Sequence, residues 1–133
     1  MILEPDYLNN ALLAFTINNS IAAVTGKIYK YDFNHNRKTE IIDTVGLVAL
    51  KGRRFLDNGA GIKDTGQFEE SVEIFGVTGN CALFLKKALI DIKIDNEFFD
   101  EDFFMYKEDV DLCWRFLLYG WKNFYYPSAI AYH

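Results

Sequence analysis

Hydrophobic positions recur with a helical period at the start of the chain and with a strand period through much of its middle. Leu8, Leu12 and Phe15 lie three or four residues apart, on one face of a helix predicted over residues 4–18. Pro5 favours a helix start there, because the N–H that a proline lacks has no partner in the first turn. We expect the apolar stripe to be the face that this helix buries.

Strand-forming runs dominate the middle of the chain and return at its end. β-Branched, aromatic and partly alternating residues predict strands over residues 21–31, 41–42, 47–50, 54–56, 72–76, 121–126 and 129–133. Pro127 is expected to end the strand over residues 121–126, because proline cannot donate to a sheet ladder. The glycine-rich residues 58–66 predict a surface excursion or a flexible flap.

Two further helices are predicted in the second half of the chain, a short one over residues 88–92 and a longer one over residues 108–119. Apolar residues run nearly all round the longer helix, so we expect it to be buried on most faces, Trp114 included. Residues 95–107 form an acidic and aromatic loop before it. These elements predict one α/β domain over residues 1–133, with a mixed sheet and packed helices.

Composition and charge narrow the possible partners. Half of the residues are hydrophobic and 17% are aromatic, which is enough for a substantial core. The net charge of −5 argues against a nucleic-acid partner and against direct binding to an anionic membrane surface. No apolar run approaches the roughly 18 residues of a membrane span. Cys81 and Cys113 lie among apolar residues and predict buried free thiols, with a disulfide between them left open.

The clearest candidate chemistry lies at the start of the helix over residues 108–119. Glu108 and Asp109 occupy its first turn, where unpaired N–H groups and the helix dipole favour negative charge. They can therefore be simple caps, or one of them can be a general base that the helix holds rigidly at a cleft. Asp111 and Arg115 are four residues apart and can pair along the same helix.

The last third of the chain resembles the C-terminal signature of family-2 glycosyltransferases, particularly bacterial rhamnosyltransferase-like members. The signature is Phe-Asp-Glu, an aromatic stretch, Glu-Asp-x-Asp-Leu, an arginine, a glycine, a proline and a histidine. It is matched by Phe99, Asp100, Glu101, Phe103, Phe104, Glu108, Asp109, Asp111, Leu112, Arg115, Gly120, Pro127 and His133. Residues 77–89 and 4–8 resemble two further segments of the family, so the resemblance covers nearly the whole chain.

This resemblance implies an inverting, metal-assisted transfer of a sugar from a nucleotide-diphosphate donor to a saccharide or lipid-linked acceptor. The parent pathway would be cell-surface polysaccharide synthesis. Asp109 would be the general base, and Glu108 would orient the site or contact the acceptor. Gly79 and Asn80 would line the pocket for the donor sugar.

Three other residues take their expected roles from the same resemblance. His133 would bind a divalent metal, Mg²⁺ or Mn²⁺, or contact the diphosphate of the donor. Asp111 and Arg115 would lie at the substrate site, although their spacing equally predicts a pair that holds the helix in place.

The resemblance also implies the C-terminal half of a glycosyltransferase A-type fold. The nucleotide-binding half of the family ends in Asp-x-Asp, and no such motif stands before Glu4. We therefore expect an acceptor-side part of a catalytic domain that is inactive alone, lies in the cytoplasm or at the inner face of the membrane, and can self-associate through an exposed sheet edge. The alternative is a non-catalytic carbohydrate-binding or assembly module.

Overall fold

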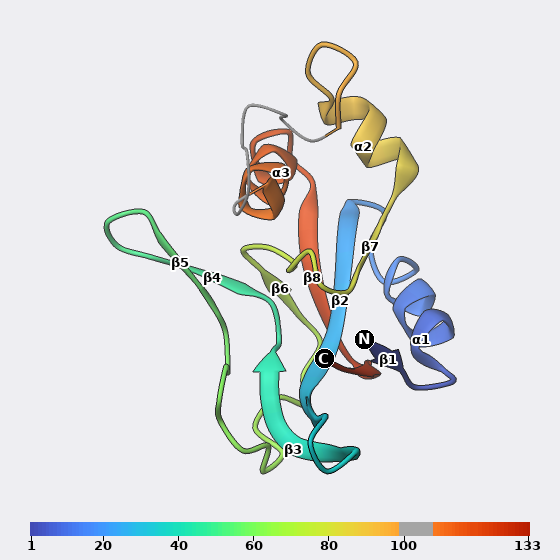
Figure 1. The fold of residues 1–133 in the computed structure, drawn as a ribbon. Coiled ribbons are helices and arrows are strands. Elements are labelled where there is room, and N and C mark those ends of the chain that lie inside the picture. Colours follow the sequence, from blue (N-terminus) through green and yellow to red (C-terminus); the bar gives the residue numbers. More distant parts are fainter. Residues whose placement is uncertain (99–107) are drawn as a thin grey trace.

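A six-stranded mixed sheet organises the molecule (Figure 1), whose computed structural model describes residues 1–98 and 108–133. Its strands are β1 (Ile2–Leu3), β2 (Ile21–Asp32), β3 (Arg37–Thr44), β6 (Val72–Ile74), β7 (Ala82–Phe84) and β8 (Lys122–Tyr132). The order is β1-β8-β2-β3, with β6 paired to β8 and β7 paired to β2. The pair β2–β8 is parallel and the other pairs are antiparallel, which confirms the predicted mixed sheet.

The remaining strands and the helices surround this sheet. Strands β4 (Leu47–Leu50) and β5 (Arg54–Asp57) form a separate antiparallel hairpin, which projects from the rest of the molecule in Figure 1. The helices are α1 (Tyr7–Ala14), α2 (Lys86–Ile92) and α3 (Glu108–Leu118). Within the described part of the chain, no helix is long and apolar enough to cross a membrane.

Strand β2 joins the two main parts of the core. Every residue from Ile21 to Ile28 is buried, as expected for a central strand with a near-continuous apolar run. Helix α1 packs into one cluster with Ile21 and Val24, whereas α2 and α3 pack into another with Ala22 and Ala23.

The expected buried face of α1 was wrong for Leu8 and Leu12, although Phe15 packs against the core as predicted. The helix buries Tyr7, Ala11 and Ala14, while Leu8 and Leu12 are more than half exposed. Small alanines let the helix lie close to the sheet, and the hydroxyl of Tyr7 donates a hydrogen bond of 3.0 Å to the carbonyl of Cys81. Close approach and one long-range hydrogen bond therefore choose the packed face, and the leucine stripe faces outward.

Pro127 does not end its strand, as the sequence predicts, but lies inside β8. Thr25 pairs with Tyr125 and Lys27 pairs with Ile130, so the segment of β8 that carries Pro127 bulges out opposite Gly26. A bulge tolerates proline because its residues leave the regular ladder. A Cβ on Gly26 would lie 1.8 Å from the carbonyl oxygen of Ala129, so only glycine fits this close approach.

Helix α3 is less buried than its all-round apolar pattern predicts. Leu112, Cys113 and Phe116 are fully buried, whereas Trp114 is 45% exposed and Leu118 is 71% exposed. The buried face of the helix packs in one cluster with α2 and the start of β2, while Trp114 contacts Phe55 and Phe75. Both thiols are free, as predicted, but only Cys113 is buried, whereas Cys81 is half-buried.

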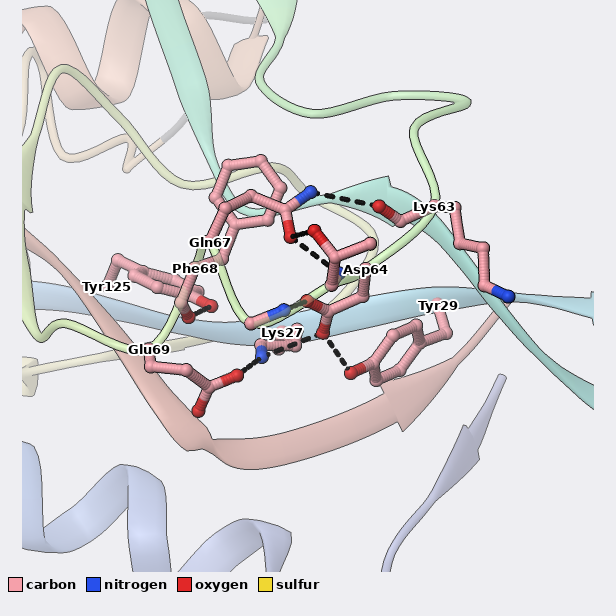
Figure 2. A network of polar contacts seen from close by, with 10 residues as sticks. Lys27, Tyr29, Lys63, Asp64, Gln67, Phe68, Glu69 and Tyr125 are labelled. Carbon is pink, nitrogen blue, oxygen red and sulfur yellow. Dashed lines mark hydrogen bonds and ion pairs between the residues drawn. The ribbon is translucent and has the colours of Figure 1, made fainter.

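The glycine-rich segment is held against the sheet as well as lying on the surface (Figure 2). The ammonium group of Lys27, which is 3% exposed, binds Asp64 at 2.9 Å and also binds Glu69. The hydroxyl of Tyr29 donates to the same oxygen of Asp64. Farther along, the hydroxyl of Tyr125 donates to the carbonyl of Phe68 at 2.8 Å. Buried polar groups of the sheet thus fasten the segment after β5.

Candidate functional site

The carboxylate of Asp109 accepts a hydrogen bond from the backbone of Gly79, which is distant from it in the sequence. As a residue of the first turn of α3, Asp109 lies where backbone N–H groups have no helical partner, and the N–H of Val110 contacts its Oδ1 at 2.8 Å. The N–H of Gly79 donates to its Oδ2 at 3.1 Å. The helix start and the turn before β7, which are 30 residues apart, are therefore joined at this carboxylate.

Asn80 and His133 form a second contact beside the first. The amide nitrogen of Asn80 lies 3.4 Å from Nδ1 of His133, and the same Nδ1 lies 2.9 Å from Oδ2 of Asp43 on β3. The shorter contact with a carboxylate assigns the proton to Nδ1, which donates to Asp43. In the neutral ring this tautomer leaves the lone pair on Nε2.

Asp57 adds a third carboxylate to the area around Asp109. Although it keeps part of its surface in water, desolvation by neighbouring protein atoms raises the pKa of its carboxyl, and the charges of Asp43 and Asp109 raise the pKa further. A site that gathers like charges in this way is suited to hold a proton or to meet a cationic or hydroxyl-bearing ligand.

A pocket of about 420 Å³ lies between the β4–β5 hairpin and the start of α3. It is lined by Leu47, Arg53, Arg54, Phe55, Leu56, Asp57, Asp109 and Val110. The hairpin is tied to the body at its base, because the N–H of Leu47 donates to the carbonyl of Gly76 at 2.7 Å. The candidate base thus faces an open pocket and not the core.

Aromatic side chains surround the same hairpin. The ring of Phe55, which lines the pocket, lies 5.0 Å from the ring of Phe75 and 6.1 Å from that of Trp114. Phe75 and Trp114 are 5.8 Å apart and nearly perpendicular. The edge-to-face contacts of Trp114 with Phe55 and Phe75 position β5 beside α3, and they leave much of Trp114 at the surface.

Asp111 and Arg115 make contacts that hold α3 in place. Nε of Arg115 donates to Asp111 at 2.9 Å, and its two terminal nitrogens donate to the carbonyls of Ile92 and Phe98 at 2.9 and 2.7 Å. Arg115 is only 7% exposed. Neither Asp111 nor Arg115 lines the pocket. Glu108 is exposed and precedes Asp109 at the start of the helix, and it does not line the pocket either.

The metal ligand set is not completed by the described residues. Among residues 1–98 and 108–133, no group of three His, Cys, Asp or Glu side chains is arranged to hold a metal ion. His133 and Asp43 bind each other, which gives two groups of the right chemistry and no third. The described residues therefore do not by themselves fit the divalent ion that the resemblance implies.

The structure brings together four of the predicted site residues, namely Gly79, Asn80, Asp109 and His133. Asp43 and Asp57 were missed in the sequence, because a single carboxylate near a strand end is ordinary. Their signal was weak: a polar residue within the apolar run 41–48, and an acid directly after a strand. Residues 99–107 of the predicted acidic loop 95–107, which include Asp100, Glu101, Phe103, Phe104 and Tyr106, lie outside the described residues.

Comparison with known proteins adds no further assignment. A scan against models of protein families finds none that matches the chain, and a search of curated proteins finds no match either.

Proposed function

We propose that the pocket at the start of α3 is the acceptor-side site of a glycosyltransferase that uses a nucleotide-diphosphate sugar. The observation that supports this most is the hydrogen bond between the N–H of Gly79 and Asp109. The resemblance assigns these two residues to the donor-sugar pocket and to the general base, respectively. A carboxylate fixed beside a glycine turn and open to a pocket is what such a reaction needs.

In the proposed reaction, Asp109 takes the proton of an acceptor hydroxyl as the hydroxyl oxygen attacks the anomeric carbon of the donor sugar. The bond from that carbon to the diphosphate oxygen breaks, and the nucleotide diphosphate leaves with the electron pair. Each carboxylate oxygen of Asp109 keeps a lone pair beyond the backbone contact that it already makes. The backbone contacts therefore orient the base without consuming its capacity to accept a proton.

Gly79, Asn80 and His133 would contact the donor in this scheme. A Cβ on Gly79 would meet only Asp109, at 3.9 Å, so the described structure leaves room for a ligand above this turn. Asp43 would act as a positioning residue that holds the imidazole of His133 in one tautomer.

We also propose that the mixed sheet is the C-terminal half of a glycosyltransferase A-type fold. His133 directly follows β8, at the carboxyl end of one of the two parallel strands, and open α/β sheets bind ligands at such ends. The donor nucleotide would then be bound mainly by a nucleotide-binding half outside these 133 residues, and the chain alone is expected to transfer no sugar.

A second candidate function is binding of carbohydrate without catalysis. The observation in its favour is the aromatic cluster of the half-buried Phe55 and Phe75 and the exposed Trp114 beside the pocket, since aromatic faces pack well against sugar rings. The two candidates differ in their ligands, because a pure binding module would respond to saccharides but not to nucleotide sugars.

Amide NMR spectra of the ¹⁵N-labelled chain test both candidates. Titration with neutral oligosaccharides and, separately, with nucleotide-diphosphate sugars is expected to shift the amide signals of Gly79, Asn80 and Val110. Asp109→Asn should change these shifts, whereas Glu108→Gln should not, because Asp109 lines the pocket and Glu108 does not. Ligand responses confined to other surfaces would refute the assigned site, and a response to saccharides alone would favour the binding module.

A further inference from the structure

The tip of the β4–β5 hairpin is basic although the chain as a whole is acidic. Lys51, Arg53 and Arg54 lie within four consecutive residues, in a protein whose net charge is −5. Two of these cations, Arg53 and Arg54, line the pocket that also contains Asp57 and Asp109. The pocket therefore has an acidic end at α3 and a basic end at the hairpin tip.

The two arginines are not used to neutralise the acidic end. Among the described residues, neither Arg53 nor Arg54 makes an ion pair, although two carboxylates line the same pocket. The pKa of Asp57 is raised, first by desolvation and then by Asp43 and Asp109, so the guanidinium groups do not set its titration. No described residue pairs with their charges, which leaves their donors open to a ligand on the side of the described pocket.

The spacing along β5 sets how far such a ligand must reach. Three steps of extended strand separate Arg54 from Asp57, which corresponds to about 10 Å at 3.3 Å per residue. The acidic end would hold the reacting hydroxyl at Asp109. A group that the arginines bind must then lie well away from that hydroxyl, on a distant part of the same molecule.

We infer that the acceptor is an acidic saccharide, whose carboxylate or phosphate binds Arg53 and Arg54 while its hydroxyl lies at Asp109. The planar guanidinium group presents paired N–H donors that match both kinds of oxyanion. This inference rests on the proposed function and narrows its substrate class. It makes the hairpin the element that selects the acceptor, with Arg53 and Arg54 as specificity-determining residues.

The test compares acidic and neutral sugars on the same labelled chain. Glucuronate and glucose 6-phosphate are titrated against glucose, and the arginine Nε–H signals are followed together with the amides of Gly79, Asn80 and Val110. Both acids are expected to shift the hairpin arginines, and at least one should bind about tenfold tighter than glucose, the change expected for one charge-assisted hydrogen bond. Whichever of the two acids binds more tightly shows whether the acceptor carries a carboxylate or a phosphate.

Matched variants separate a specific site from general charge. The double variant Arg53→Gln and Arg54→Gln should bind the acids no better than glucose, with glucose binding unchanged. Arg37→Gln removes an arginine whose side chain is 69% exposed and lies outside the pocket, so it should preserve the preference. All three positions are at the surface, and unchanged dispersion of the amide spectra checks that the variants fold.

Three results would overturn the inference. Equal binding of glucose and both acids would remove the acidic acceptor while leaving the proposed function in place. An equal loss of the preference for acidic sugars in the Arg37→Gln variant would show that the preference comes from net charge alone. Shifts of the hairpin arginines by uridine diphosphate or by vesicles of anionic lipid, without shifts by the acidic sugars, would assign the hairpin to the donor or to a membrane. If no sugar shifts Gly79, Asn80 or Val110, the proposed function fails as well.

Discussion

Replacement of Asp64 by asparagine removes one of the two carboxylates that bind the buried ammonium group of Lys27. Burial alone would raise the pKa of Asp64, but the hydrogen bonds from Tyr29 and Lys27 outweigh burial and hold it at about 2, below the ordinary value of 3.8. The side chain of Asp64 is 9% exposed. The folded state therefore favours the ionised carboxyl more strongly than the unfolded chain does.

Linkage converts this difference into free energy of unfolding. The two pKa values correspond to between about 2 and 3 kcal/mol at neutral pH. Solvent near Glu69, which is 61% exposed, screens part of the interaction, so we expect Asp64→Asn to cost about 1–2 kcal/mol. Because the folded-state pKa is the lower one, the contribution is fully present above about pH 4 and is lost as the pH falls towards 2.

Urea denaturation at several pH values measures the effect. The difference in unfolding free energy between wild type and Asp64→Asn should be largest at pH 7 and should shrink to roughly half at pH 3. Glu69→Gln is the control, since the exposed partner of the same ammonium group should cost under about 1 kcal/mol. In a Lys27→Met background, Asp64→Asn should lose the part of its effect that comes from Lys27 and keep the part that comes from the hydrogen bond of Tyr29.

Two results would refute this reasoning. A variant as stable as wild type at pH 7 would show that Asp64 does not stabilise the segment after β5. A difference that stays constant from pH 7 to pH 3 would show that its ionisation is not the cause.

Other contacts lead to further expected outcomes. Gly26→Ala should lower the free energy of unfolding in urea by about 2–3 kcal/mol or more, because its Cβ would overlap the carbonyl of Ala129. Gly79→Ala, whose Cβ has 3.9 Å of clearance, should cost under about 1 kcal/mol. Equal losses in the two variants would contradict the bulge geometry. The thiol of Cys113 should resist Ellman's reagent at pH 8 until the protein unfolds, because burial raises its pKa to about 12, and fast labelling of the native protein at this position would contradict its burial.

Elements with a long, consistent pattern could be predicted from the sequence. Strand β2 and helix α3 have nearly the bounds that their apolar runs predict. The packed face of α1 could not be predicted, because Leu8 and Leu12 form the better stripe while close approach to the sheet favours Ala11 and Ala14. Local pattern states which residues are apolar, but the distance between two elements decides which of them are buried.

Features that depend on distant pairing were also beyond a local pattern. Pro127 looks like a strand end until β8 is paired with β2, where Gly26 makes room for the bulge. The site shows the same limit. Asp109 and Gly79 were expected together through a family resemblance, but Asp43 reaches His133 only because β3 and β8 belong to the same sheet.

The rate of sugar transfer by an Asp109→Asn variant bears most directly on the proposed chemistry. Sugar transfer is assayed for the protein that carries these 133 residues, with saturating donor and acceptor and with Glu108→Gln as the matched control. Loss of the general base should lower kcat by a factor of about 10²–10⁴, with a native spectrum and little change in the control. An Asp109→Asn enzyme that transfers sugar as fast as wild type would contradict the role of Asp109 as the base.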